Sequence, residues 1–190
     1  MEEITIGLKS TVSFSDAMTA AQEGKSSTIQ RYLDERNSGN KKARKSLLTL
    51  LHIAAGMGHT EIVQRLIAGG IKINETNKIG ETPLYLAAHN GHANVVKLLC
   101  SYRDVKGANT DLNKSLNNGT TPLHIAIQNK HFDVVNILIE YDVLINMKTS
   151  DGKTPLDFAY QADDLRIIEL LLSRGATVGT DKSLDSRSCS

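Results

Sequence analysis

The sequence predicts an all-α solenoid, a stack of short helix-turn-helix pairs joined by β-hairpin-like loops. Similar segments recur along the chain: LHIAAGMGH from Leu51, LYLAAHNGH from Leu84, LHIAIQNKH from Leu123 and LDFAYQADD from Leu156, with first leucines 33, 39 and 33 residues apart. Pairs of β-branched residues repeat at the same spacing, at Ile62 and Val63, Val95 and Val96, Val134 and Val135, and Ile167 and Ile168. All three prolines also share one position of the repeat. Separate patterns with one period indicate repeating structural units.

The proline positions predict where the first helix of each pair begins. Each proline stands in a Thr-Pro-Leu segment, at Pro83, Pro122 and Pro155. Threonine accepts hydrogen bonds as a helix N-cap, and proline at the first helical position gives up only an amide that has no partner there. Gly80, Gly119 and Gly152 come just before and supply a turn.

Residue size and periodicity predict that the pairs stack on one another. The first helices carry small residues, which let a neighbouring repeat approach closely, at Ala54, Ala55, Ala87, Ala88, Ala126 and Ala159. The second helices are amphipathic, as in HANVVKLLC and HFDVVNILIE. A pair this short cannot bury its own apolar face, so a continuous stack is expected.

With TPLxxAAxxGHxxVVxxLL at a period of 33 residues, the chain closely resembles the ankyrin repeat family over about residues 14–178. The segment AMTAAQEGKSSTIQRYL aligns with LHIAAGMGHTEIVQRLI and indicates a degenerate first repeat, in which Tyr32 takes the core position of Leu66. The resemblance implies an extension over 1–13, an ankyrin repeat domain over 14–178 and a flexible tail over 179–190. Its repeats are expected at 14–46 (a degenerate cap), 47–79, 80–118 with an insertion, 119–151 and 152–178.

The chain departs from the family pattern at several places, none of which is expected to break the fold. Leu50 stands where proline is expected, Asn129-Lys130 replaces part of a Gly-His turn, and Ala162-Asp163-Asp164 changes that turn in the last repeat. Residues 37–45, NSGNKKARK, lengthen the loop between the first two repeats. About six extra residues between Cys100 and Gly119 are expected to extend a helix or to bulge the loop.

Composition argues against partners other than proteins. The formal net charge of the 190 residues is +1, so no overall field attracts nucleic acid or anionic lipid. The two cysteines cannot build a disulfide framework, and no segment has the length of a signal peptide or a membrane span. We expect a soluble, cytoplasmic protein or one exported by another route. The basic run Lys41 to Lys45 is a solvated loop, a nuclear-import signal or a patch that binds an anionic ligand.

The candidate chemical groups are explained by the repeat pattern. His52 and His124 occupy the TPLH position, and His59, His92 and His131 occupy the turn position, where the family uses histidine to bond the backbone at repeat junctions. His89 lies at a variable inner position with too few partners for zinc. No nucleophile with its base, no phosphate loop and no CxxC pair is present, so neither an enzyme nor a cofactor is expected.

The resemblance implies a protein-binding concave surface built from the hairpin tips and the first helices. It places the binding residues in the variable positions of the repeats, which are Met57, Lys78, Ile79, Glu81, Tyr85, His89 and Asn90, then Asn117, Asn118, Thr120, Gln128 and Asn129, and finally Ser150, Asp151, Lys153, Gln161 and Ala162. This strip is mostly polar and rich in amides, so a polar and roughly neutral partner is expected, with Met57, Ile79 and Tyr85 as apolar anchors.

Two functions remain open from the sequence. The first is a monomeric protein-interaction adaptor. The second is a secreted effector or regulatory inhibitor of an intracellular microbe that blocks a host protein, favoured by Lys, Ile and Asn usage typical of an AT-rich genome. The family also implies asparagine hydroxylation as a further possibility, at Asn74, Asn113 or Asn146.

Overall fold

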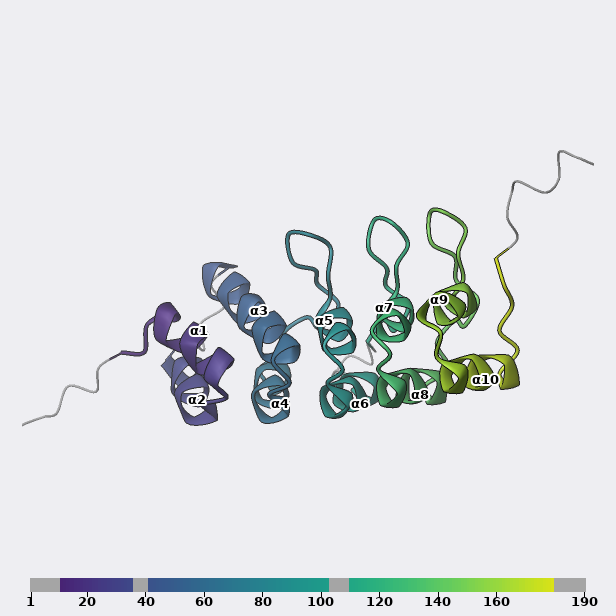
Figure 1. Cartoon of the computed structure of the whole chain (residues 1–190). Helices are drawn as coiled ribbons and strands as arrows, with labels where there is room; N and C mark the ends of the chain where they lie inside the picture. The colour runs from purple at the N-terminus through teal and green to yellow at the C-terminus, as the bar shows by residue number, and fades with distance from the viewer. Residues whose placement is uncertain (1–10, 36–40, 103–109, 180–190) are drawn as a thin grey trace, which may run out of the picture.

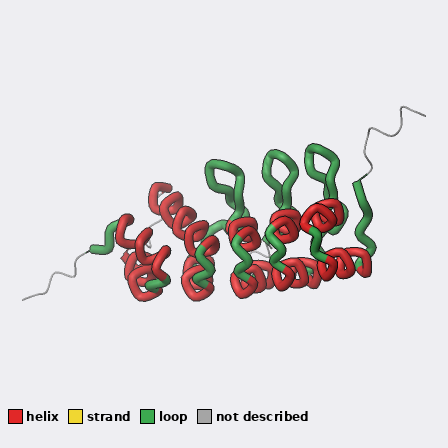
Figure 2. The backbone as a smooth tube through the Cα atoms, viewed as in Figure 1, coloured by secondary structure: helices red, strands yellow, loops and turns green. Residues whose placement is uncertain are grey.

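The structure, a computed structural model, describes residues 11–35, 41–102 and 110–179. The predicted tail over 179–190 falls almost wholly outside these residues, as does most of the predicted extension over 1–13. Within the described part, the chain forms helices joined by turns and loops, with no strand (Figure 2).

The helices lie in two rows (Figure 1). The first row holds the first helix of each pair, and each contacts the next along the row: α1 (Phe14–Glu23), α3 (Lys41–Gly56), α5 (Pro83–His89), α7 (Pro122–Gln128) and α9 (Pro155–Ala162). The second row holds α2 (Ser26–Glu35), α4 (Thr60–Ala68), α6 (Ala93–Ser101), α8 (Phe132–Glu140) and α10 (Leu165–Ser173). The predicted all-α solenoid of helix-turn-helix pairs is confirmed.

The predicted starts of the later first helices are confirmed in detail. Thr82, Thr121 and Thr154 are the N-caps of α5, α7 and α9, and a proline follows each as the first helical residue. The Thr82 hydroxyl oxygen accepts a hydrogen bond from the Tyr85 amide at 3.0 Å. In the loop before each cap, the amide of one residue donates to the carbonyl four residues later, from Asn77 to Glu81, from Leu116 to Thr120 and from Thr149 to Lys153. These bonds make the loops hairpin-like, as predicted.

One continuous apolar core runs between the two rows. The small residues of the first helices lie in it, since Ala54, Ala87 and Ala126 are fully buried. Tyr32 is also fully buried, which confirms that it fills a core position of the degenerate first repeat.

Helix α3 differs from the other first helices, because it begins well before the position that proline occupies elsewhere. It has 16 residues, whereas α5 and α7 have 7 each. The prediction that the whole insertion over 37–45 is loop is therefore wrong, since α3 begins at Lys41. The reason is local: proline would break a helix at this point, and Leu50, which replaces it, keeps the amide that a helix interior requires.

The second insertion does not lengthen its helix. Helix α6 ends at Ser101 and has 9 residues, as α4 and α8 do. Of the two outcomes expected for the residues after Cys100, helix extension is therefore wrong. The extra residues fall between α6 and the next hairpin loop, partly over 103–109, outside the described residues.

Candidate protein-binding groove

Three hairpin loops project from the first row of helices, away from the second row (Figure 1). They span residues 71–82, 110–121 and 143–154 and precede α5, α7 and α9. We call the surface formed by these loops and by the exposed sides of the first helices the loop face. It is the surface on which the sequence places the binding residues.

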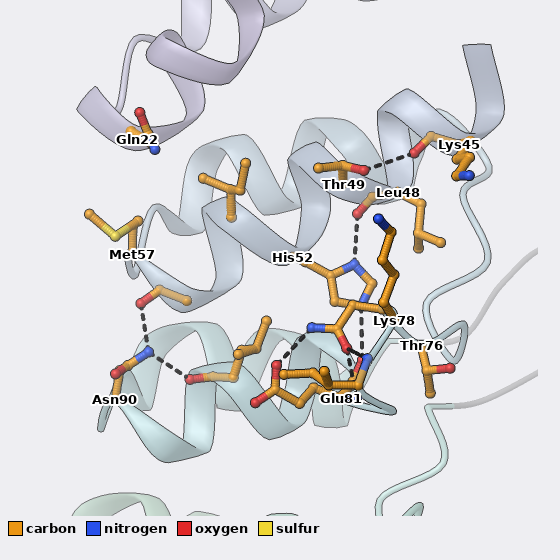
Figure 3. Close-up of a pocket in the computed structure, with 15 residues that line it drawn as sticks. Gln22, Lys45, Leu48, Thr49, His52, Met57, Thr76, Lys78, Glu81 and Asn90 are labelled. Carbon is orange, nitrogen blue, oxygen red and sulfur yellow. Dashed lines mark hydrogen bonds between the residues drawn. The ribbon is translucent and has the colours of Figure 1, made fainter. Parts of the chain in front are cut away.

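One hollow on this face is a groove between α3, the loop 71–82 and α5 (Figure 3). Its volume is about 790 Å³, which is within the range of sites that accept a side-chain cluster or a small molecule. Apolar side chains line much of it, from Leu48, Ile53, Met57, Ile79 and Leu86. Two of them are well exposed, Met57 at 52% and Ile79 at 68%. We call this hollow the α3 groove.

The polar groups on the floor of the α3 groove are already bonded to one another. The His52 imidazole bridges two backbone carbonyls, with Nδ1 2.7 Å from the Leu48 oxygen and Nε2 3.0 Å from the Glu81 oxygen. The Glu81 carboxylate accepts a hydrogen bond of 2.7 Å from Asn77 Nδ2. Asn90 donates through Nδ2 to the Gly56 and Leu86 carbonyls at 3.0 and 3.1 Å. These bonds hold the floor rigid without filling the space above it.

The predicted site residues divide into three places. Met57, Lys78, Ile79, Glu81 and Asn90 line the α3 groove. Gln128, Gln161 and Ala162 line, with Phe158, a smaller hollow of about 230 Å³ between α7 and α9. The others lie on the loop face outside both hollows, at His89 and Asn129 and on the loops at Asn117, Asn118, Ser150, Asp151 and Lys153.

Two of the predicted site residues are buried, so the expectation that they face a partner is wrong. Tyr85 is 5% exposed and lies edge-on to the His89 ring, with centroids 6.3 Å apart. It occupies the position of His52 and His124, which are also buried. Burial raises the pKa of the Tyr85 phenol. Thr120 is 7% exposed, and its carbonyl accepts the Leu116 amide across the loop.

The α3 groove includes residues that the sequence prediction missed. Lys45, Leu48 and Thr49 belong to the extra turns of α3, and Gln22 belongs to α1. A signal for α3 was available, because the apolar spacing of SLLTLLHIAA continues upstream of Leu50 without a break. The groove is accordingly more apolar than the amide-rich strip that the sequence predicts.

The turn histidines bond the preceding repeat, as predicted. The Nε2 atoms of His59, His92 and His131 lie 2.8, 2.8 and 2.9 Å from the carbonyls of Gln22, Gly56 and His89. Each ring also covers a glycine of that preceding repeat. A Cβ atom on Gly58 or Gly91 would lie 2.6 Å from Nδ1 of the histidine above it.

The position of those glycines explains one departure from the family pattern. Gly58, Gly91 and Lys130 hold equivalent places and all have positive φ, at 78°, 75° and 58°. Lys130 tolerates a side chain because the following repeat carries Asp164 in place of a histidine, so no ring lies above it.

Asparagines join the loops of successive repeats. The Oδ1 atoms of Asn74, Asn113 and Asn146 each accept a hydrogen bond of 2.8 Å from a backbone amide of the next repeat, at Asp111, Leu144 and Thr177. These side chains therefore set the spacing of the loops along the loop face. Their hydroxylation stays a prediction.

Two further findings concern metals and membranes. Within residues 11–35, 41–102 and 110–179, no three His, Cys, Asp or Glu side chains are grouped so that they could hold a metal ion. No helix in the same ranges is long and apolar enough to span a lipid bilayer.

Comparison with known proteins agrees with the repeat geometry. The family model for ankyrin repeats, which spans three copies, matches residues 17–113 and 105–182. The chain belongs to the ankyrin repeat family. Ankyrin repeats are protein–protein interaction modules and are generally non-catalytic. The repeats of this chain thus form a structure whose general use is to bind other proteins.

The similar curated proteins are much longer than this chain. The tyrosine-protein kinase HTK16 of Hydra vulgaris is 32% identical over 79% of this chain and 20% of its own length. The transcription factor MBP1 of Kluyveromyces lactis is 30% identical over 67% of this chain and 19% of its own. Protein phosphatase 1 regulatory subunit 12A of Mus musculus is 34% identical over 37% of this chain and 7% of its own. The chain thus spans about a fifth of the first two, and their names describe different activities.

Proposed function

We propose that this chain is a non-catalytic adaptor module that binds a partner protein across its loop face, with the α3 groove as the main contact. The observation that carries the proposal is the exposure of Met57, just after α3, and of Ile79, on the loop 71–82, in the lining of one largely apolar hollow. Large apolar side chains that stay exposed in a concave site are typical of interaction surfaces.

The rest of the loop face supports the same use. Farther along the loop face lie exposed amide side chains, among them Asn117, Gln128 and Gln161, which can form the polar part of an interface. The hydrogen bonds beneath the groove hold its floor in place before a partner arrives. A preformed surface loses less conformational entropy when it binds.

The test is quantitative affinity capture from native lysate with the intact chain and with a double variant, Met57→Asp and Ile79→Asp. Neither side chain is buried, so the variant is expected to keep the helical content of the intact chain. Loss of two central apolar contacts is expected to lower capture of a bound partner by about tenfold or more.

The matched control is Leu165→Asp on α10, outside the α3 groove. Leu165 is 70% exposed, close to the 68% of Ile79, so the two changes introduce similar charge at similarly exposed apolar positions. Capture that falls for the groove variant but not for Leu165→Asp supports the proposal. Equal capture by the intact chain and the groove variant would overturn it.

A further inference from the structure

The α3 groove exists because of a departure from the repeat pattern. Counting back from Pro83 by one repeat gives Leu50, so residues 41–49 of α3 precede the usual helix start. These nine residues add about 13 Å of helix, at 1.5 Å per residue. Figure 1 shows α3 extending beside the loop that precedes α5, as a wall that the other repeats do not have.

That wall brings two lysines to the groove from opposite sides. Lys45 lies on the extra turns of α3, and Lys78 lies on the loop 71–82 (Figure 3). Both are exposed, and neither forms an ion pair or a hydrogen bond through its side chain with another described residue. In contrast, Lys72 on the same loop lies within 4 Å of the Glu75 carboxylate, and Lys153 on the loop 143–154 lies within 4 Å of the Asp151 carboxylate.

The charge of the lining is therefore uneven. Glu81 is the acidic residue that lines the groove, and its carboxylate is bonded to Asn77. Lys45 lies near the N-terminal end of α3, where the helix dipole is also positive. The part of the groove between Lys45 and Lys78 is thus positive, while apolar side chains line much of the rest.

We propose that the occupant of the α3 groove is a short acidic peptide segment of the partner protein, with apolar side chains next to carboxylates. Its apolar side chains pack on Leu48, Ile53, Met57 and Ile79, and its carboxylates pair with Lys45 and Lys78. The inference rests on the proposed function and adds the chemistry of the partner. It replaces the polar and neutral partner that the sequence predicts.

The lining favours a peptide over a nucleic acid. Single-stranded nucleic acids are held by cations together with aromatic side chains on which the bases stack. Among the described residues that line this groove there is no Phe, Tyr or Trp, and its apolar side chains are aliphatic. Aliphatic side chains of a peptide pack well on Leu and Ile, and the flexible side chain of Met adapts to their shape.

The experiment selects displayed random twelve-residue peptides on the full chain and measures the best binder as a labelled synthetic peptide by fluorescence anisotropy. The expected consensus places Asp or Glu beside Leu, Ile or Phe. The double variant Lys45→Glu, Lys78→Glu is expected to weaken binding by about tenfold or more, because like charges then face each other. A peptide with its acids changed to lysine should regain affinity for this variant.

The matched control is Lys97→Glu, which reverses an exposed lysine of α6 in the second row and should change affinity less than twofold. A consensus without acids, equal binding by the double variant, or tighter binding of a labelled oligothymidylate probe would overturn the inference. The adaptor proposal is tested separately, by capture of the native partner. If the acidic-peptide inference fails but the Met57→Asp, Ile79→Asp variant loses that capture, the adaptor proposal stands.

Discussion

The buried His124 should make the stability of the protein fall between pH 7 and pH 5. Its ring is fully buried between Thr121, whose hydroxyl oxygen lies 2.8 Å from Nδ1, and Phe158, whose ring centroid lies 5.0 Å away. Loss of solvation lowers the pKa of the imidazole from 6.5 to about 4, although nearby carbonyls and the Asp151 carboxylate act in the opposite direction.

The sign and size of the effect follow from proton linkage. As the pH falls below 6.5, the unfolded chain takes up a proton that the folded chain does not accept until about pH 4. Stability is thus complete above pH 6.5 and is lost as the pH falls toward 4. A pKa difference of this size lowers the free energy of unfolding by about 2 kcal/mol between pH 7 and pH 5 and by about 3 kcal/mol in full.

The assay is urea unfolding at both pH values, followed by far-ultraviolet circular dichroism. His124→Asn, whose Oδ1 can accept in place of Nδ1, should be less stable at pH 7 but should lose less than about 0.5 kcal/mol on going to pH 5. His89→Gln changes an exposed ring and serves as the control that keeps the full difference. Equal stability of the intact chain at both pH values, or an undiminished difference in His124→Asn, would refute the reasoning.

Three further outcomes test the repeat junctions and the core. Gly91→Ala should cost at least about 1 kcal/mol more in urea unfolding than Gly152→Ala, because both have positive φ but only Gly91 lies under a histidine ring, that of His131; equal losses would contradict this. Asn113→Ala should cost about 1 kcal/mol and speed hydrogen exchange of the amide that it binds; unchanged exchange would count against the link. Burial raises the pKa of the Cys100 thiol to about 12. In a variant without the other cysteine, alkylation of Cys100 at pH 8 should therefore be about a thousandfold slower in the folded protein than in the protein unfolded in urea. Comparable rates would show that the thiol is accessible in the folded protein.

The sequence predicts the repeating part of the fold well, because the determinants there are local. A threonine cap, a following proline and a preceding glycine define each helix start within a few residues, as at Thr82 and Thr121. The turn histidines are equally predictable, since their position is fixed by the same short motif.

The candidate site is less predictable, because its main features arise where the motif fails. Leu50 considered by itself predicts no change in the fold, and the insertion over 37–45 considered by itself predicts a loop. Together they permit a helix that starts at Lys41 and raises one wall of the α3 groove. The side-chain direction of Tyr85 is a second case: this aromatic residue is buried because the backbone turns its position inward, as it does at His52 and His124.

The contact between a glycine of one repeat and a histidine of the next also limits the order in which these repeats can stand. Suppose that the last repeat were exchanged for a second copy of the one before it. The copy's equivalent of His131 would then lie over Lys130, which has a side chain where Gly58 and Gly91 have none. A repeat that ends its turn with lysine can only be followed by one without that histidine. The units of this stack are therefore not interchangeable parts, and any recombined or extended version must change both sides of a junction at once.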